Sequence, residues 1–130
     1  MASFLDTSFV LRYIAGDDPA MLRRSKEVIE SDESLIITDA VLMEAAFVLA
    51  SVYKTQRENI VDLLVGLIQK ENISVYGINK GVVLKALLMC RPSGRVSVTD
   101  ALTWATAISA GVGIYTFDKR FPSEGLEILN

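Results

Sequence analysis

The sequence predicts an α/β protein with a central, mainly parallel sheet. Short apolar runs typical of buried strands alternate along the chain with longer segments whose apolar residues recur at helical spacing. Alternation of this kind is typical of parallel sheets covered by helices. The composition agrees, because 51% of the residues are hydrophobic and strands buried on both faces consist mostly of such residues. With 130 residues, the chain has the length of one domain, and we expect a single domain over residues 1–130.

The first half of the chain contains two expected strands and four expected helices. The apolar segment 3–5 predicts a first strand, and residues 7–14 predict a short helix. Pro19 favours the first turn of a helix, and 20–31 continues as an amphipathic helix. The β-branched run 34–38 predicts a second strand. Two strongly apolar helices are then expected at 39–53 and 56–70.

The second half of the chain predicts three more strands and two helices. A strand at 73–76 precedes a helix at 80–90, which ends before Pro92 because the residue before a proline disfavours helical geometry. An almost uncharged helix is expected at 98–110. The last two strands are expected at 113–116 and 126–129. The whole sheet therefore has about five strands.

The composition excludes several kinds of chemistry. The chain contains no histidine, which removes Ser-His-Asp and Cys-His catalysis and histidine-bound zinc. The single cysteine, Cys90, excludes an intrachain disulfide and fits a reducing compartment, so we expect a cytoplasmic protein. A formal charge of −3 argues mildly against nucleic acid held by bulk charge alone.

We expect no membrane association. The longest uncharged run, 101–117, is interrupted by Gly111 and Gly113 and is better explained as a helix followed by a strand. The N-terminal residues lack the basic segment of a signal peptide.

Acidic residues follow the expected strands at the edge where open parallel sheets bind their ligands. Asp6 directly follows the strand 3–5, and Asp118 follows the strand 113–116. Asp100 lies in the first turn of the helix that precedes the second of these strands. Thr116 and Ser8 stand close by in the sequence and can add hydroxyl groups or hold water.

Glu44 is the fourth acid of the set, and its helix neighbours three and four positions away are apolar. An ionised side chain on such a face is costly unless a cation meets it. The acids also have simpler explanations, because Asp6 and Asp39 suit helix caps and Asp100 forms a capping box with Ser97. Carboxylates without histidine form a hard-oxygen set that suits Mg²⁺ or Mn²⁺.

The chain resembles the PIN-domain family of metal-dependent ribonucleases, and most of all the VapC-type toxins of bacterial and archaeal toxin–antitoxin pairs. The resemblance spans the whole chain and rests on four segments in order. These segments are FLDTSFVLRYI with Asp6, TDAVLMEAAFVL with Glu44, VTDALTWATAISAG with Asp100, and GIYTFDKRF with Thr116 and Asp118.

The resemblance implies a three-layer α/β/α fold that gathers the four acids at one edge of the sheet. It also implies hydrolysis of RNA phosphodiester bonds with Mg²⁺ or Mn²⁺, in which Asp6, Asp100 and Asp118 are ligands. Glu44 either completes the metal shell or orients the attacking water. Relatives of this kind are typically homodimers that bind a small antitoxin. The apolar helices 39–53 and 56–70 also favour a dimer, because exposed apolar surface usually marks an interface.

Basic residues near the acids are candidates for contact with RNA phosphates. An ordinary solvated charge is the alternative explanation for each of them. The candidates are Lys119, Arg120, Arg91, Arg95 and Arg12.

Other functions fit the sequence less well. An aspartate-based phosphatase of the haloacid-dehalogenase type expects a second aspartate two residues after Asp6, where this chain has Ser8. A receiver domain expects an N-terminal acid pair and a late lysine that are missing here. A PIN-like module that binds RNA or protein without catalysis is the main alternative.

Overall fold

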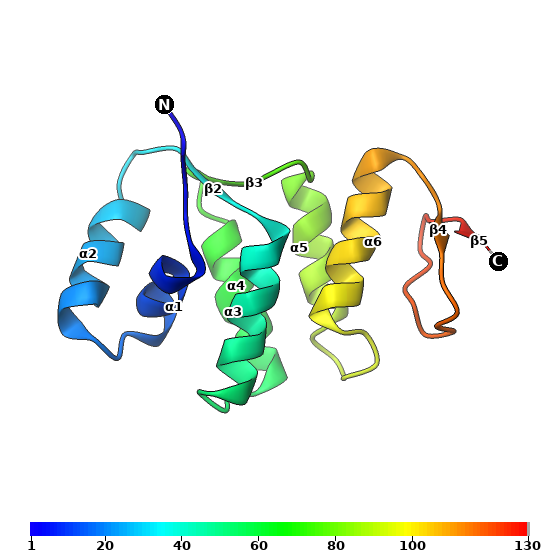
Figure 1. Ribbon diagram of the computed structural model, residues 1–130, viewed down its shortest axis with the longest axis horizontal. Helices are drawn as coiled ribbons and strands as arrows, with labels where there is room; N and C mark the ends of the chain where they lie inside the picture. The colour runs from blue at the N-terminus through cyan, green and yellow to red at the C-terminus, as the bar shows by residue number, and fades with distance from the viewer. Residues whose placement is uncertain (130) are drawn as a thin grey trace.

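The computed structural model describes residues 1–129, and Figure 1 shows their arrangement. The helices are α1 (Thr7–Ala15), α2 (Pro19–Ile29), α3 (Asp39–Ser51), α4 (Arg57–Ile68), α5 (Lys80–Met89) and α6 (Val98–Ala110). The strands are β1 (Ser3–Phe4), β2 (Leu35–Ile37), β3 (Ile73–Val75), β4 (Ile114–Tyr115) and β5 (Ile128–Leu129). Every expected element is therefore present, with small shifts at its ends, and the predicted α/β class is confirmed.

The strands form two separate parallel sheets. β1, β2 and β3 pair in that order, with Ser3 opposite Leu35 and Leu35 opposite Ile73. β4 pairs only with β5, with Ile114 opposite Ile128. The expectation of one sheet of about five strands is therefore wrong for this conformation. The strands of the second sheet have two residues each, so only a few backbone hydrogen bonds determine which strand each of them pairs with.

The hydrophobic core lies between the three-stranded sheet and the helices. Its largest fully buried side chains come from all six helices and from strands β2 and β3, and include Val10, Ile29, Leu35, Ile37, Leu42, Leu64, Leu87 and Leu102. Trp104 of α6 is also buried, as its apolar surroundings in the sequence suggest. Among residues 1–129, no helix is both long and apolar enough to cross a bilayer.

Helix ends follow the local chemistry of the sequence. In five of the six helices, a side-chain oxygen of the residue before the helix accepts a backbone N–H of the first turn. These capping residues are Asp6, Asp18, Thr38, Asn79 and Ser97. Gly16 and Gly111 end α1 and α6 in the left-handed conformation, with φ of 64° and 71°. Glycine adopts this backbone without steric cost.

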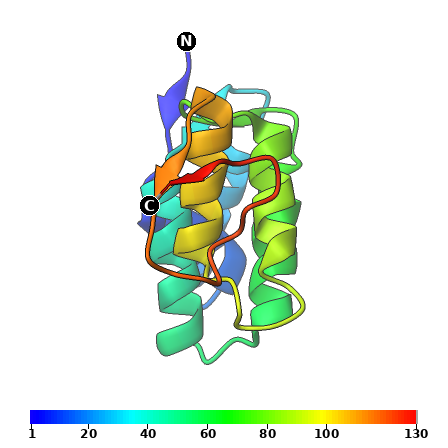
Figure 2. The same cartoon turned by 90° about the vertical axis from the view of Figure 1, so that its right-hand side faces the viewer.

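The C-terminal ribbon, which we define as residues 112–129, packs against the outer face of α6. Figure 2 shows β4 and β5 in front of this helix, with β1 at the far side of the molecule. The Nε1–H of Trp104 donates to the carbonyl of Glu124 at 2.9 Å. Lys85 of α5 forms a salt bridge of 2.7 Å with the Glu124 carboxylate. These contacts hold the ribbon against α5 and α6, and the ribbon therefore lies away from the larger sheet.

Asn72 ties the chain before β3 to the loop after α2. Its side-chain amide donates to the backbone carbonyls of Ile29, Ser31 and Glu33, each at 3.1 Å. We expect Asn72→Asp to lower the free energy of unfolding by about 1–3 kcal/mol, because the carboxylate has no hydrogen to donate and leaves these carbonyls unpaired.

The matched control for this variant is Asn79→Asp. Asn79 caps α5 by accepting the N–H of Val82 at 3.2 Å, a role that aspartate fills equally well. Urea denaturation of both variants measures the difference. Equal stability of Asn72→Asp and Asn79→Asp would show that the donated hydrogen bonds contribute nothing.

Candidate active site

Asp6 lies at the junction of β1 and α1 and caps the helix. Its carboxylate accepts the Ser8 hydroxyl at 2.9 Å and the Ser8 N–H at 3.5 Å. These hydrogen bonds lower the pKa of Asp6 below its ordinary value, so the side chain is an anion at neutral pH. Asp6 is exposed to solvent. It therefore combines the structural role of a cap with the charge and access that a ligand needs, and the Ser8 hydroxyl binds its carboxylate.

Asp100 lies in the first turn of α6 and is partly buried. Its backbone N–H donates to the Ser97 hydroxyl at 3.0 Å, which is the cap predicted for this helix.

The thiol of Cys90, near Asp100, is buried. Burial and the negative charge of Asp100 raise the pKa of Cys90 to about 11, because together they outweigh the opposing effect of the positive charge of Arg57. The thiol is therefore protonated at neutral pH and is not a nucleophile.

Glu44 projects from α3 toward solvent. We expected an apolar, costly environment for this carboxylate, and that expectation is wrong. Glu44 is exposed, and so are Ala40 and Phe47 on the same side of the helix. The apolar residues that surround Glu44 in the sequence therefore leave its charge in water, and no desolvation cost demands a cation at this position.

Asp118 lies in the turn that follows β4. Its carboxylate accepts the N–H of Arg120 at 2.8 Å, and its own N–H donates to the Thr116 hydroxyl at 3.0 Å. The Arg120 guanidinium is 4.0 Å from the same carboxylate. Thr116 thus holds the backbone of Asp118, whereas Ser8 donates to the carboxylate of Asp6 itself. Both acids stand in short turns that leave the carboxylate exposed.

The four acids do not converge in one copy of the chain. Across residues 1–129, no group of three acidic or cysteine side chains is placed to hold a metal ion. The split of the sheet explains this, because Asp6 follows β1 and Asp118 follows β4, and α6 stands between the two sheets (Figure 1). The donor atoms are the oxygens that Mg²⁺ prefers, but among residues 1–129 no three of them are grouped around one point in this conformation.

Three of the basic candidates form ion pairs. The guanidinium of Arg91 binds both carboxylate oxygens of Asp62, at 2.9 and 3.0 Å. This pairing raises the pKa of Arg91 and lowers the pKa of Asp62. Arg12 pairs with Asp17 at 3.0 Å. Arg91 and Arg12 are therefore engaged within the fold. Arg120 lies 4.0 Å from the Asp118 carboxylate, and Arg95, Lys119 and Arg120 are all exposed.

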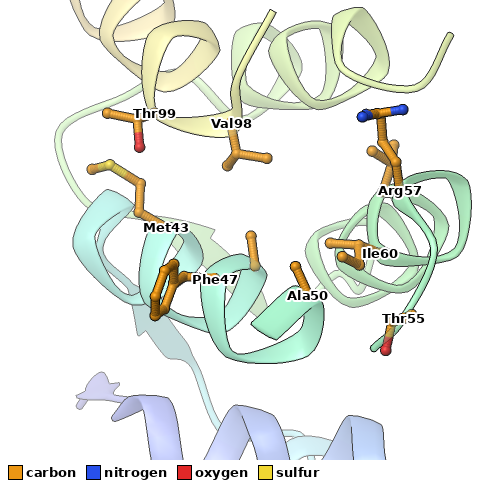
Figure 3. Close-up of a pocket in the computed structure, with 10 residues that line it drawn as sticks. Met43, Phe47, Ala50, Thr55, Arg57, Ile60, Val98 and Thr99 are labelled. Atoms are coloured by element: carbon orange, nitrogen blue, oxygen red, sulfur yellow. The ribbon is translucent and has the colours of Figure 1, made fainter. Parts of the chain in front are cut away.

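A cavity of about 380 Å³ was not expected from the sequence. It lies between α3, α4 and the start of α6. Figure 3 shows Met43, Phe47 and Thr99 on one side and Arg57 and Ile60 on the other. Neither Glu44 nor Asp100 lines this cavity, although their sequence neighbours Met43 and Thr99 do. The only signal for it in the sequence was the unusually apolar helix that became α3.

A family model for the PIN domain matches residues 3–123. This span includes all four acids and nearly the whole chain, so the chain belongs to the PIN-domain family. PIN domains are nuclease-type domains that generally depend on divalent metal ions. A comparison with curated proteins finds no match.

Proposed function

We propose that the protein is a divalent-metal-dependent ribonuclease and the toxin of a toxin–antitoxin pair. The observation that carries this proposal is the family match over residues 3–123 together with an acid at every motif position. Asp6, Glu44, Asp100 and Asp118 are the acids concerned. The absence of histidine supports it, because phosphodiester hydrolysis in this chain must then rely on carboxylates and a hard metal ion.

The acids have separate parts in this proposal. Asp6, Asp100 and Asp118 provide the oxygen ligands for Mg²⁺ or Mn²⁺, and Glu44 completes that set or orients water. The exposed cations Arg95, Lys119 and Arg120 contact RNA phosphates, which an acidic site would otherwise repel.

The proposed partners are RNA, a second copy of the chain and a small antitoxin. Exposed apolar side chains on α3 and at its end support a protein partner, because Phe47 is 70% and Val52 67% exposed. A PIN-like module that binds without cutting is the second candidate. The separation of the acids in a single copy favours that alternative, and so the two must be distinguished by assay.

The direct test is incubation of the purified protein with a labelled single-stranded RNA and with DNA of the same sequence, in the presence of Mg²⁺. We expect cleavage of the RNA. Retention of intact RNA, with binding detected by a gel shift, would instead identify a non-catalytic module. The toxin role is checked by expression in a bacterial host, where arrested growth should be relieved by the protein of the adjoining reading frame.

A further inference from the structure

Two further cavities adjoin each other beside Asp6. The first, of about 340 Å³, is lined by Asp6 itself, by residues of β1 and by Arg24 of α2. The second, of about 270 Å³, lies between α1 and α2, which pack side by side at one end of the molecule in Figure 1. Phe9 and Arg24 line both cavities, and we call the two together the α1–α2 groove. The second cavity is lined by Ser8, Phe9, Arg12, Met21, Arg24 and Ser25.

The charges of the two cavities differ. Asp6 and Glu33 line the first cavity together with Arg24. Within residues 1–129, the lining of the second cavity contains two arginines and no acid. A chain with a formal charge of −3 therefore places a positively charged cavity directly next to the one that contains Asp6. This arrangement suits an anion that reaches from the second cavity to a metal ion at Asp6.

The two arginines of the groove are held only by exposed ion pairs. Arg24 lies 3.3 Å from Glu27, with side chains that are 67% and 57% exposed. Arg12 uses one guanidinium nitrogen for Asp17, at 3.0 Å. Exposed pairs of this kind contribute little to stability. A phosphate, which can accept two N–H groups of one guanidinium, can therefore replace Glu27 at Arg24 without disturbing the fold.

The second cavity has apolar side chains that suit a flat ring. Phe9 is partly buried and packs against the core, and Met21 is 50% exposed on α2. Nucleobases stack on aromatic side chains whatever their sequence, and the flexible side chain of methionine adapts to the shape of its partner. Phe9 and Met21 therefore offer the two kinds of surface that an unpaired base needs.

The two serines of the second cavity present hydrogen-bond acceptors. The Ser8 hydroxyl donates to Asp6 at 2.9 Å, and the Ser25 hydroxyl donates to the Leu22 carbonyl at 3.0 Å. Each hydroxyl has one hydrogen but two lone pairs, so both have used their hydrogen and retain acceptor capacity. Ser25 is only 1% exposed, which makes it a built part of the cavity wall. An N–H on the edge of a base is the group that these oxygens can bind.

We propose that the α1–α2 groove holds the nucleotide next to the cleaved bond of a single-stranded RNA. Its base lies in the second cavity against Phe9 and Met21, and its phosphate binds Arg24. Because Arg24 also lines the cavity that contains Asp6, this contact positions the neighbouring phosphate at Asp6. The proposal rests on the proposed function for the identity of the ligand, and it adds a substrate-binding residue and a base subsite that the motifs do not include.

A pair of adjacent arginine variants tests the groove by binding alone. Arg23→Ala is the matched control for Arg24→Ala, because Arg23 has the same charge, is exposed and lines neither cavity. Fluorescence anisotropy with labelled single-stranded RNA in EDTA measures affinity without cleavage. Arg24→Ala should weaken binding about tenfold, as for the loss of a charged hydrogen bond, and should reduce the salt dependence by about one phosphate contact. Arg23→Ala should bind as the wild type does.

Equal RNA affinities of these two variants would overturn the proposal. It would also be overturned if Arg24→Ala left RNA binding unchanged but weakened the complex with the protein of the adjoining reading frame, because the groove would then be a protein-docking surface. Circular dichroism of both variants checks that α2 is intact.

Kinetics separate the groove from the proposed function. With Mg²⁺ present, Arg24→Ala should raise KM about tenfold and leave kcat unchanged, because the contact holds substrate and transition state equally. A wild type that cleaves RNA with the same KM as both variants would overturn the groove alone. A wild type that binds RNA through Arg24 and never cleaves it would reject the ribonuclease and support the groove.

Photochemical crosslinking tests the base subsite without any variant. Single-stranded RNA that contains 5-iodouridine is bound to the wild-type protein in EDTA and irradiated, and mass spectrometry identifies the attached peptide. We expect attachment within α1 or α2, at Phe9 or Met21. Attachment confined to other helices or to the C-terminal ribbon would overturn the base subsite.

Discussion

Replacement of Asp118 with asparagine is expected to reduce RNA cleavage by at least about 100-fold, the larger end of the loss seen when groups around a metal site are altered. Asparagine retains the oxygen that accepts the Arg120 N–H at 2.8 Å, so the turn after β4 should be unchanged. The variant loses only the negative charge. Cleavage rates and thermal unfolding measured on the same preparation separate a loss of chemistry from a loss of fold.

Asp6→Asn and Asp100→Asn should cause losses of similar size. The asparagine of the first variant can still cap α1, because asparagine and aspartate are about equally good at this position. The matched control is Asp18→Asn, which alters the same kind of cap on α2, where Asp18 accepts the Met21 N–H at 3.0 Å. This control should cleave at the wild-type rate. Wild-type activity in the Asp6, Asp100 and Asp118 variants would show that these acids serve only as caps and turn residues.

Removal of divalent ions is expected to have the largest effect of all. Excess EDTA should abolish cleavage, and Mg²⁺ or Mn²⁺ added beyond the chelator should restore it, because the candidate ligands are carboxylates and the chain has no histidine. Circular dichroism recorded in EDTA checks that the helices are intact. Cleavage that persists in EDTA would exclude the proposed metal dependence and leave the four acids without their assigned role.

Helices were predicted well because their signals are local. In the sequence, Ser97 marks the start of α6 and Gly111 marks its end. The structure begins and ends the helix at these two residues. The core followed from the same information, since the helical spacing of Ile60, Leu64 and Leu67 directs one face of α4 inward.

Strand pairing was not predictable in the same way. The residues Ile114 and Tyr115 indicate a strand, but a two-residue strand contains no information about which neighbour it pairs with. The alternation of strands and helices suggested one sheet, and the structure instead attaches β4 and β5 to the outside of α6. The positions of Asp6 and Asp118 in the sequence could therefore suggest, but not establish, that they meet.

The environments of individual side chains were also not predictable from the sequence. The apolar neighbours of Glu44 predicted burial, yet the side chain is exposed because the buried face of α3 is formed by Leu42, Ala45 and Leu49. The ion pair between Arg91 and Asp62 joins residues from different parts of the chain, so neither segment alone could reveal it.

The hydrogen bond from Trp104 to the Glu124 carbonyl gives the protein a built-in optical signal. Trp104 is the only tryptophan in the chain, it is 2% exposed, and its indole N–H is bound to the ribbon itself. Indole emission depends on the polarity around the ring and on this hydrogen bond. The fluorescence of the unmodified protein therefore follows the attachment of residues 112–129 to α6, separately from the helical content that circular dichroism records.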